Sequence, residues 1–176
     1  MRYFEDIVIG TRRELGTYTF TVERIKAFAG KYDPQPFHLD EQAGRKSLFG
    51  GLAASGWHTA AAWMRTAIDS GSRRSGAAKA GDDAMVGGPS PGFKNLRWPK
   101  PVLAGDTITF FTEVKAKRAS MTRPQWGLIF VLNTGENQRG ELVFSFDGSA
   151  FVARRSASEQ EASPPDVSGT TPASGQ

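Results

Sequence analysis

An aspartate and a histidine lie close together in the segment Asp33–His38, with Pro34 and Pro36 between them. Proline restricts its own backbone and that of the residue before it, so we expect a stiff loop that fixes the distance between the two side chains. A carboxylate and an imidazole have different pKa values and can together hold one water molecule and move its protons. The segment therefore predicts an acid–base pair. The alternative is a turn aspartate before proline and a histidine that caps the next turn.

A second segment that could do chemistry is Ala54–Trp57, where Ser55 and Gly56 precede a run of helix-forming residues. The first turn of a helix presents backbone N–H groups without intrahelical partners at the positive end of the helix dipole. Such groups can stabilise a carbonyl oxygen that gains negative charge. We expect Gly56 to let a substrate approach the backbone closely, the alternative being a glycine that only starts a helix.

Several other chemistries find no support in the sequence. It contains no cysteine and only two histidines, His38 and His58, so we expect no disulfide, no thiol nucleophile and no metal site. No glycine-rich dinucleotide or nucleotide-binding motif and no serine-nucleophile elbow is present, and we expect no cofactor.

The composition limits the partners. The net charge is +4, and the basic residues are scattered without interleaved aromatic residues, so we expect no nucleic acid partner. No apolar run reaches the roughly 20 residues that span a bilayer, and we expect no membrane association. The N-terminus lacks a secretory signal pattern, and the absence of cysteine suits a reducing compartment, so we expect a cytoplasmic protein.

Helical periodicity predicts two main helices. Residues 22–32 have one apolar face and follow Thr21, a suitable N-cap residue. A short helical turn is expected within residues 39–47. A long alanine-rich helix should begin at Gly56 and stop at Gly71.

Strand patterns predict a sheet. We expect a strand within residues 11–20 and four more in the second half of the chain, at residues 93–98, 107–117, 126–132 and 142–146. Such a sheet must bury one face, and the alanine-rich helix is its natural partner, which predicts an α+β fold. We expect one domain over residues 1–155, with an exposed loop rich in glycine and serine at about 70–92 and a disordered tail at 156–176.

Two ordered motifs resemble one known family. The run Asp33–His38 (DPQPFH), followed by Phe49–Gly51 and then Ser55 and Gly56, is similar to the signature of the MaoC-like dehydratases, which include the (R)-specific enoyl-CoA hydratases. Residues 93–107 resemble a second segment of the same family, and the resemblance covers roughly residues 5–155.

This resemblance implies a hot-dog fold, in which a curved antiparallel sheet wraps around a long central helix, and a homodimer or higher homo-oligomer. It implies hydration of a trans-2-enoyl-CoA to a 3-hydroxyacyl-CoA, with CoA as part of the substrate. Asp33 and His38 would activate water, and the N–H of Gly56 would bind the thioester carbonyl. The expected substrate-binding residues are Gln35, Ser55, Trp57, Arg97 and Lys100.

Three positions differ from the family pattern, and two other functions stay open. Gln35 replaces the usual asparagine, Ser55 a common histidine, and Met64 a serine that some hydratases have. Trp57 and Trp63 could narrow the acyl pocket and favour short or branched chains. The alternatives to a hydratase are a hot-dog acyl-CoA thioesterase and a catalytically idle acyl-CoA binding subunit.

Overall fold

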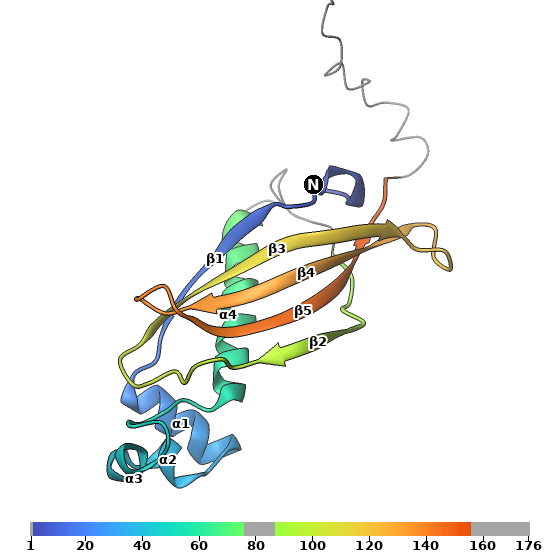
Figure 1. The fold of residues 1–176 in the computed structure, drawn as a ribbon. Coiled ribbons are helices and arrows are strands. Elements are labelled where there is room, and N and C mark those ends of the chain that lie inside the picture. Colours follow the sequence, from blue (N-terminus) through green and yellow to red (C-terminus); the bar gives the residue numbers. More distant parts are fainter. Residues whose placement is uncertain (1, 76–86, 156–176) are drawn as a thin grey trace, which may run out of the picture.

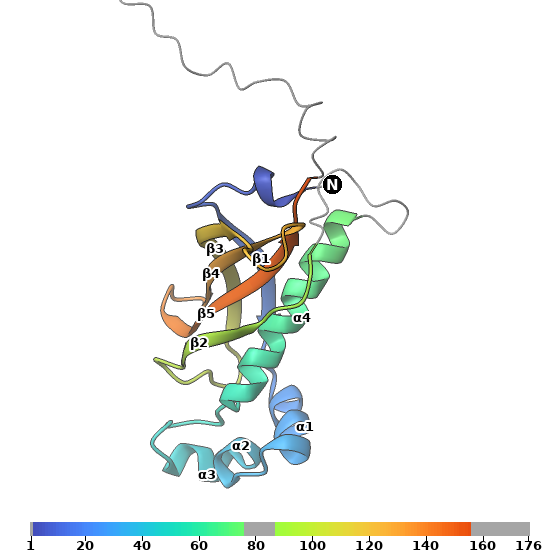
Figure 2. The same ribbon diagram turned by 90° about the vertical axis from the view of Figure 1, so that its right-hand side faces the viewer.

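The computed structural model describes residues 2–75 and 87–155, which form a curved antiparallel sheet with a long helix along one of its faces (Figures 1 and 2). This arrangement confirms the predicted α+β class. The elements in chain order are η1 (Phe4–Asp6), β1 (Arg12–Thr19), α1 (Val22–Tyr32), α2 (Pro36–Leu39), α3 (Glu41–Lys46), α4 (Gly56–Ser75), β2 (Gly92–Arg97), β3 (Thr107–Ala119), β4 (Trp126–Glu136) and β5 (Leu142–Ala153).

The five strands lie in the order β1-β3-β4-β5-β2, and all neighbours are antiparallel. The last three strands form a meander, as the period-two pattern predicted. β1 and β2 are the edge strands. The main apolar core includes Leu15, Phe110 and Phe144 from the sheet and Ala62 from α4. Small alanine side chains on α4 allow the helix to lie close to the curved sheet.

Helix α1 coincides with the prediction, since the hydroxyl of Thr21 accepts a hydrogen bond from the N–H of Arg24 at 3.3 Å and caps the helix. The expected stop at Gly71 is wrong, because α4 continues to Ser75. A glycine inside a helix costs only about 1 kcal/mol relative to alanine and does not end the helix by itself.

The predicted loop at residues 70–92 is accordingly too long at both ends. Its first part belongs to α4, and near its other end Gly87 makes a β-bridge to Val152 before β2 begins. The intervening residues 76–86 and the predicted tail at 156–176 lie outside the described residues.

Helices α1, α2 and α3 form a separate group at one end of the sheet, beside the start of α4 (Figure 2). The predicted stiff loop from Asp33 to His38 is only partly right. Pro36 opens the short helix α2, because proline suits the first turn of a helix, where its missing N–H has no partner. His38 therefore lies on a helix, and α3 follows it.

Candidate active site

Asp33 lies directly after α1, where its N–H still donates to the carbonyl of Ala29 at 2.9 Å. Its carboxylate accepts a hydrogen bond of 2.7 Å from Nε2 of Gln35. A side-chain hydrogen bond from Ser55, together with the one from Gln35, lowers the pKa of Asp33 below its usual value. The group is therefore a carboxylate over the whole neutral range.

His38 is held in one orientation by the backbone. Its Nδ1 lies 2.7 Å from the carbonyl oxygen of Ala53, and a carbonyl can only accept, so Nδ1 carries the hydrogen. The neutral ring then presents its lone pair at Nε2, which lies 3.4 Å from Oδ2 of Asp33. The side chain of His38 is 6% exposed and that of Asp33 is 21% exposed. The pair is sheltered, and its carboxylate edge remains accessible.

Gly56 is the first residue of α4, so its N–H has no partner in a preceding helical turn. The next N–H, that of Trp57, is 3.3 Å from the Ser55 hydroxyl and can donate to it. The N–H of Gly56 is therefore the donor best placed to meet a ligand at this helix start.

The structure shows a second reason for glycine at position 56, beside the expected approach of a substrate. A Cβ atom there would lie 2.7 Å from Cε2 of Trp98, so the indole ring occupies the space of the missing side chain. Nε1 of Trp98 also donates to the carbonyl of Gly56 at 2.9 Å. The packing of Trp98, and not only the approach of a substrate, requires glycine here.

One cavity of about 420 Å³ brings most of the predicted site residues together. Residues from the turn after α1, from α2, from the start of α4 and from the segment after β2 surround it. Its lining includes Asp33, Gln35, His38, Ser55, Gly56, Trp57 and Lys100. Arg97, the remaining predicted site residue, is exposed on β2 and does not line this cavity.

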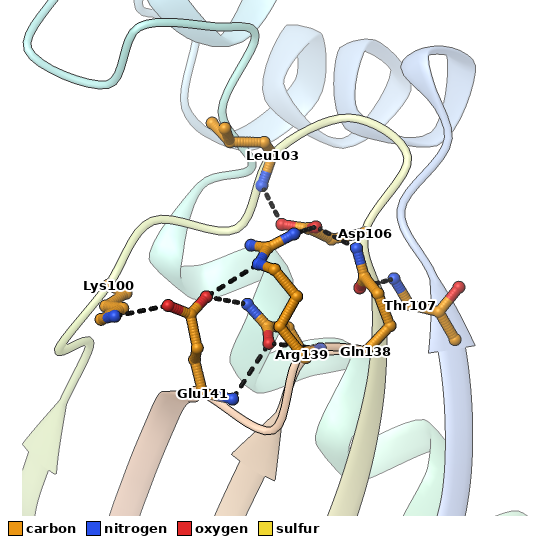
Figure 3. A network of polar contacts seen from close by, with 8 residues as sticks. Lys100, Leu103, Asp106, Thr107, Gln138, Arg139 and Glu141 are labelled. Carbon is orange, nitrogen blue, oxygen red and sulfur yellow. Dashed lines mark hydrogen bonds and ion pairs between the residues drawn. The ribbon is translucent and has the colours of Figure 1, made fainter.

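Lys100 is anchored at the cavity by an ion pair with Glu141, in which Nζ lies 2.6 Å from Oε1 (Figure 3). Asn137 and Arg139 also donate to this carboxylate, at 2.8 and 2.9 Å. The hydrogen bonds from Asn137, Lys100 and Arg139 lower the pKa of Glu141 to about 2. The β4–β5 turn thus fixes a cation that lines the site.

The same network reaches the loop between β2 and β3 (Figure 3). Asp106 is buried, accepts from Gln138 at 2.8 Å, and accepts from the N–H of Leu103 at 2.9 Å. Nη1 of Arg139 lies 3.5 Å from its carboxylate. Asp106 therefore ties the loop that carries Lys100 to the β4–β5 turn.

The second histidine, His58, lies outside this cavity although it is on the first turn of α4. Its ring stacks on Phe28 at a centroid distance of 4.7 Å, and Tyr18 lies at hydrogen-bonding distance, 3.2 Å from Nε2. Burial lowers the pKa of His58 to about 4, so the ring is neutral near pH 7. His58 is a core residue in this structure.

Several residues of the site were not foreseen as such. Trp98 is not among the site residues expected from the sequence, and no local pattern links it to Gly56. Phe37 and Phe49 enclose His38, with ring centroids 4.6 and 6.3 Å from the imidazole. Phe49 belongs to the Phe49–Gly51 motif, which was the available signal for it.

The described ranges contain neither a cluster of metal-binding side chains nor a membrane-spanning helix. No group of three or more histidine, cysteine, aspartate or glutamate side chains in residues 2–75 and 87–155 could hold a metal ion. None of the helices in these ranges is long and apolar enough to cross a membrane.

The chain is similar to proteins of one family in both sequence and fold. Residues 6–125 match the family described as MaoC like domain. The uncharacterized protein YdeM of Bacillus subtilis is 29% identical over 150 residues, which cover 85% of this chain and 98% of that protein. A MaoC-like dehydratase from Rhodospirillum rubrum is 38% identical, with a TM-score of 0.72 over 89% of this chain and 99% of the other. R-hydratase PhaJ1 from Pseudomonas aeruginosa shares the fold at 19% identity, with a TM-score of 0.60 and coverage of 87% and 86% of the two chains.

Proposed function

Because the chain belongs to the MaoC-like dehydratase family and has its hot-dog fold, we propose that it is a hydro-lyase that adds water reversibly to a trans-2-enoyl-CoA to give a 3-hydroxyacyl-CoA. One observation carries the proposal. Nε2 of His38 lies 3.4 Å from the carboxylate of Asp33, in the same cavity as the free helix start at Gly56. This arrangement supports the proposal, because a group for proton transfer and a donor for an oxyanion would then face the same substrate.

In the direction of hydration, the substrate water binds beside the pair, within hydrogen-bonding reach of both Asp33 and His38. Nε2 of His38 takes one proton, since Nδ1 is already protonated and held by Ala53. The water oxygen forms a bond to C3, and the electron pair of the double bond moves through C2 to the thioester oxygen. The N–H of Gly56 donates to that oxygen.

The reaction finishes when the thioester carbonyl re-forms and C2 takes the proton from His38. The net change is one hydroxyl on C3 and one hydrogen on C2. Asp33 stays ionised throughout because its pKa is lowered, so it accepts a hydrogen bond from the water and stabilises the imidazolium that forms. Elimination of water follows the same steps in reverse.

The CoA portion would enter past Lys100, whose ammonium group can pair with a phosphate. Glu141 already neutralises this cation, so the ion pair at 2.6 Å favours a role in orientation over a large gain in affinity. Arg97 is exposed on the edge strand β2 and is a second candidate for the phosphates.

A homodimer is part of the proposal. β2 is an edge strand that pairs only with β5 among the described strands, and it can join a second sheet edge to edge. Large apolar side chains near it are exposed, including Phe93 at 59%, Trp57 at 58% and Met64 at 50%. A second copy of the chain would cover them.

The test is to supply trans-2-enoyl-CoA thioesters and to follow the double bond and free thiol separately. We expect loss of the double bond without thiol release. Asp33→Asn and His38→Ala should each lower kcat/KM by about 10²–10⁴-fold, the usual contribution of a general acid or base. Lys26→Ala, which removes an exposed cation paired with Glu41, is the matched control. Thiol release with the double bond intact would instead identify a thioesterase, and unchanged activity in both variants would refute the assigned roles.

A further inference from the structure

A second cavity, of about 510 Å³, lies between α4 and the sheet. Trp57 lines both this cavity and the one that holds Asp33 and His38. Most of the lining is apolar, with contributions from Ala60, Val131 and Phe144. An acyl chain whose thioester lies at Gly56 would extend past Trp57 into this space.

Three polar side chains cross the floor of this cavity in one row. In the sheet register Arg13 is opposite Thr112, and Thr112 is opposite Asn133. Directly opposed residues of antiparallel strands project from the same face with Cβ atoms about 5 Å apart. All three residues line the cavity. They form a polar row within a cavity whose lining is mostly apolar.

The row continues to an indole on the opposite wall. Asn133 is opposite Phe146 in the register, and the ring of Trp63 on α4 packs against Phe146 at a centroid distance of 4.6 Å. Gly148 leaves room for the amide, since a Cβ atom there would lie 3.0 Å from Nδ2 of Asn133. Arg13, Asn133 and Trp63 thus lie at one level of the cavity.

These polar groups lack partners among the described side chains, those of residues 2–71 and 87–155. Asn133 is 2% exposed, and no hydrogen bond within these ranges involves its side chain. Nε of Arg13 and Nε1 of Trp63 are inaccessible and have no hydrogen-bond partner, and Arg13 forms no ion pair in these ranges. A buried donor without a partner is costly, so the inaccessible Nε of Arg13 and Nε1 of Trp63 favour an acceptor group that the described residues do not supply.

The chemistry of the row defines that group. Arginine and the indole nitrogen are donors only, so the missing group must accept hydrogen bonds. The described residues that line the cavity include two arginines and no acid, so an anion is favoured. A planar carboxylate matches the guanidinium fork. Trp63 is seven residues beyond Gly56 along α4, which places the row about 10 Å from the oxyanion site at 1.5 Å per residue.

We propose that this row binds a carboxylate at the far end of the acyl chain, so that the preferred substrates are thioesters of dicarboxylic acids of medium length. The thioester end of this assignment rests on the proposed function, and the carboxylate end rests on the cavity alone. Arg13 supplies the charge, while Asn133 and Trp63 donate hydrogen bonds from either side.

The experiment compares acyl-CoA thioesters of equal length that end in a methyl group or a carboxylate. Calorimetry with the saturated compounds measures binding without turnover, and the unsaturated compounds measure hydration. We expect the purified full chain to prefer the carboxylate form. Arg13→Leu should weaken its binding by about 10- to 100-fold, as for loss of a charge-assisted hydrogen-bond pair. The melting temperature should hold or rise, because the substitution removes the buried Nε–H donor that has no partner.

Asn133→Asp is the second variant, since it gives Arg13 an internal counter-ion and should reverse the preference toward the methyl form. Arg12→Leu is the matched control, because Arg12 is the adjacent residue on β1 and is exposed in an ion pair with Glu136. The proposal is overturned if the methyl form binds more tightly to the native protein, if both variants keep the carboxylate preference, or if Arg13→Leu lowers the melting temperature as loss of a structural ion pair would. Carboxylate binding that depends on Arg13 without any hydration would overturn the proposed function alone.

Discussion

Replacing Gly56 with alanine tests the packing that shapes the start of α4. The added Cβ would lie within about 3 Å of three atoms of the Trp98 ring, at 2.7, 2.9 and 3.0 Å. The indole must move, and its hydrogen bond of 2.9 Å to the Gly56 carbonyl is lost or weakened. The substitution therefore acts on two residues that are far apart in the sequence.

The size of the effect follows from three opposing contributions. Overpacking typically costs about 1–3 kcal/mol, and a lost hydrogen bond costs about 1 kcal/mol. The higher helix propensity of alanine returns at most about 1 kcal/mol. We expect Gly56→Ala to lower the free energy of unfolding by about 1–3 kcal/mol, which corresponds to about 2–4 °C of melting temperature per kcal/mol in a domain of this size.

A double-mutant cycle with Trp98→Ala isolates the cause. Urea unfolding of the native protein, both single variants and the double variant gives the coupling energy between the two positions. In the Trp98→Ala background the clash is absent, and Gly56→Ala should be neutral or slightly stabilising. If Gly56→Ala is equally destabilising in both backgrounds, Trp98 is not the reason for glycine at this position, and the reasoning is refuted.

Two further predictions concern pH. The pKa of Glu141 is lowered from 4.5 to about 2, so its interactions stabilise the fold above about pH 4.5 and are lost as the pH falls toward 2. Glu141→Gln should therefore lower the urea midpoint at pH 7. The difference in urea midpoint between the variant and the native protein should become smaller as the pH falls. Equal differences at pH 7 and pH 3 would contradict this. The pKa of His58 is lowered from 6.5 to about 4, so the unfolded chain binds more protons between these values and stability falls as the pH drops through that window. His58→Phe should flatten that part of the profile, with His38→Phe as the comparison, and an unchanged slope would show that His58 is not the titrating group.

The candidate site was largely predictable because its main parts are local in sequence. Asp33, Gln35 and His38 lie in one short segment whose prolines restrict the backbone, and a helix start at Gly56 can be recognised from the helix-forming residues after it. These residues line one cavity because the chain reverses direction through α3 and returns to the start of α4. The indole of Trp98 on Gly56 could not be predicted, since nothing local links a residue after β2 to the start of α4.

The sheet was predictable in outline and not in detail. Regular alternation along β3 would put Val114 and Ala116 on the same face, but a bulge between these two residues shifts the register. Ala116 is exposed, while Lys117 is partly buried and its Nζ donates to the carbonyls of Phe4 and Glu5 at 3.1 and 3.2 Å. A bulge depends on the pairing of two strands, which the pattern within one strand does not reveal.

The group of short helices at one end of the sheet has a consequence for how such a protein can change. The residues proposed for proton transfer and for the oxyanion all come from the continuous segment between α1 and the first turn of α4, whereas the polar row around Arg13 and Asn133 comes from the strands. Under the two proposals, substitutions in the strands would change which acyl group binds while the residues proposed for the reaction stay in place. In this fold, the residues proposed for the reaction and those proposed for substrate choice can therefore change independently during evolution.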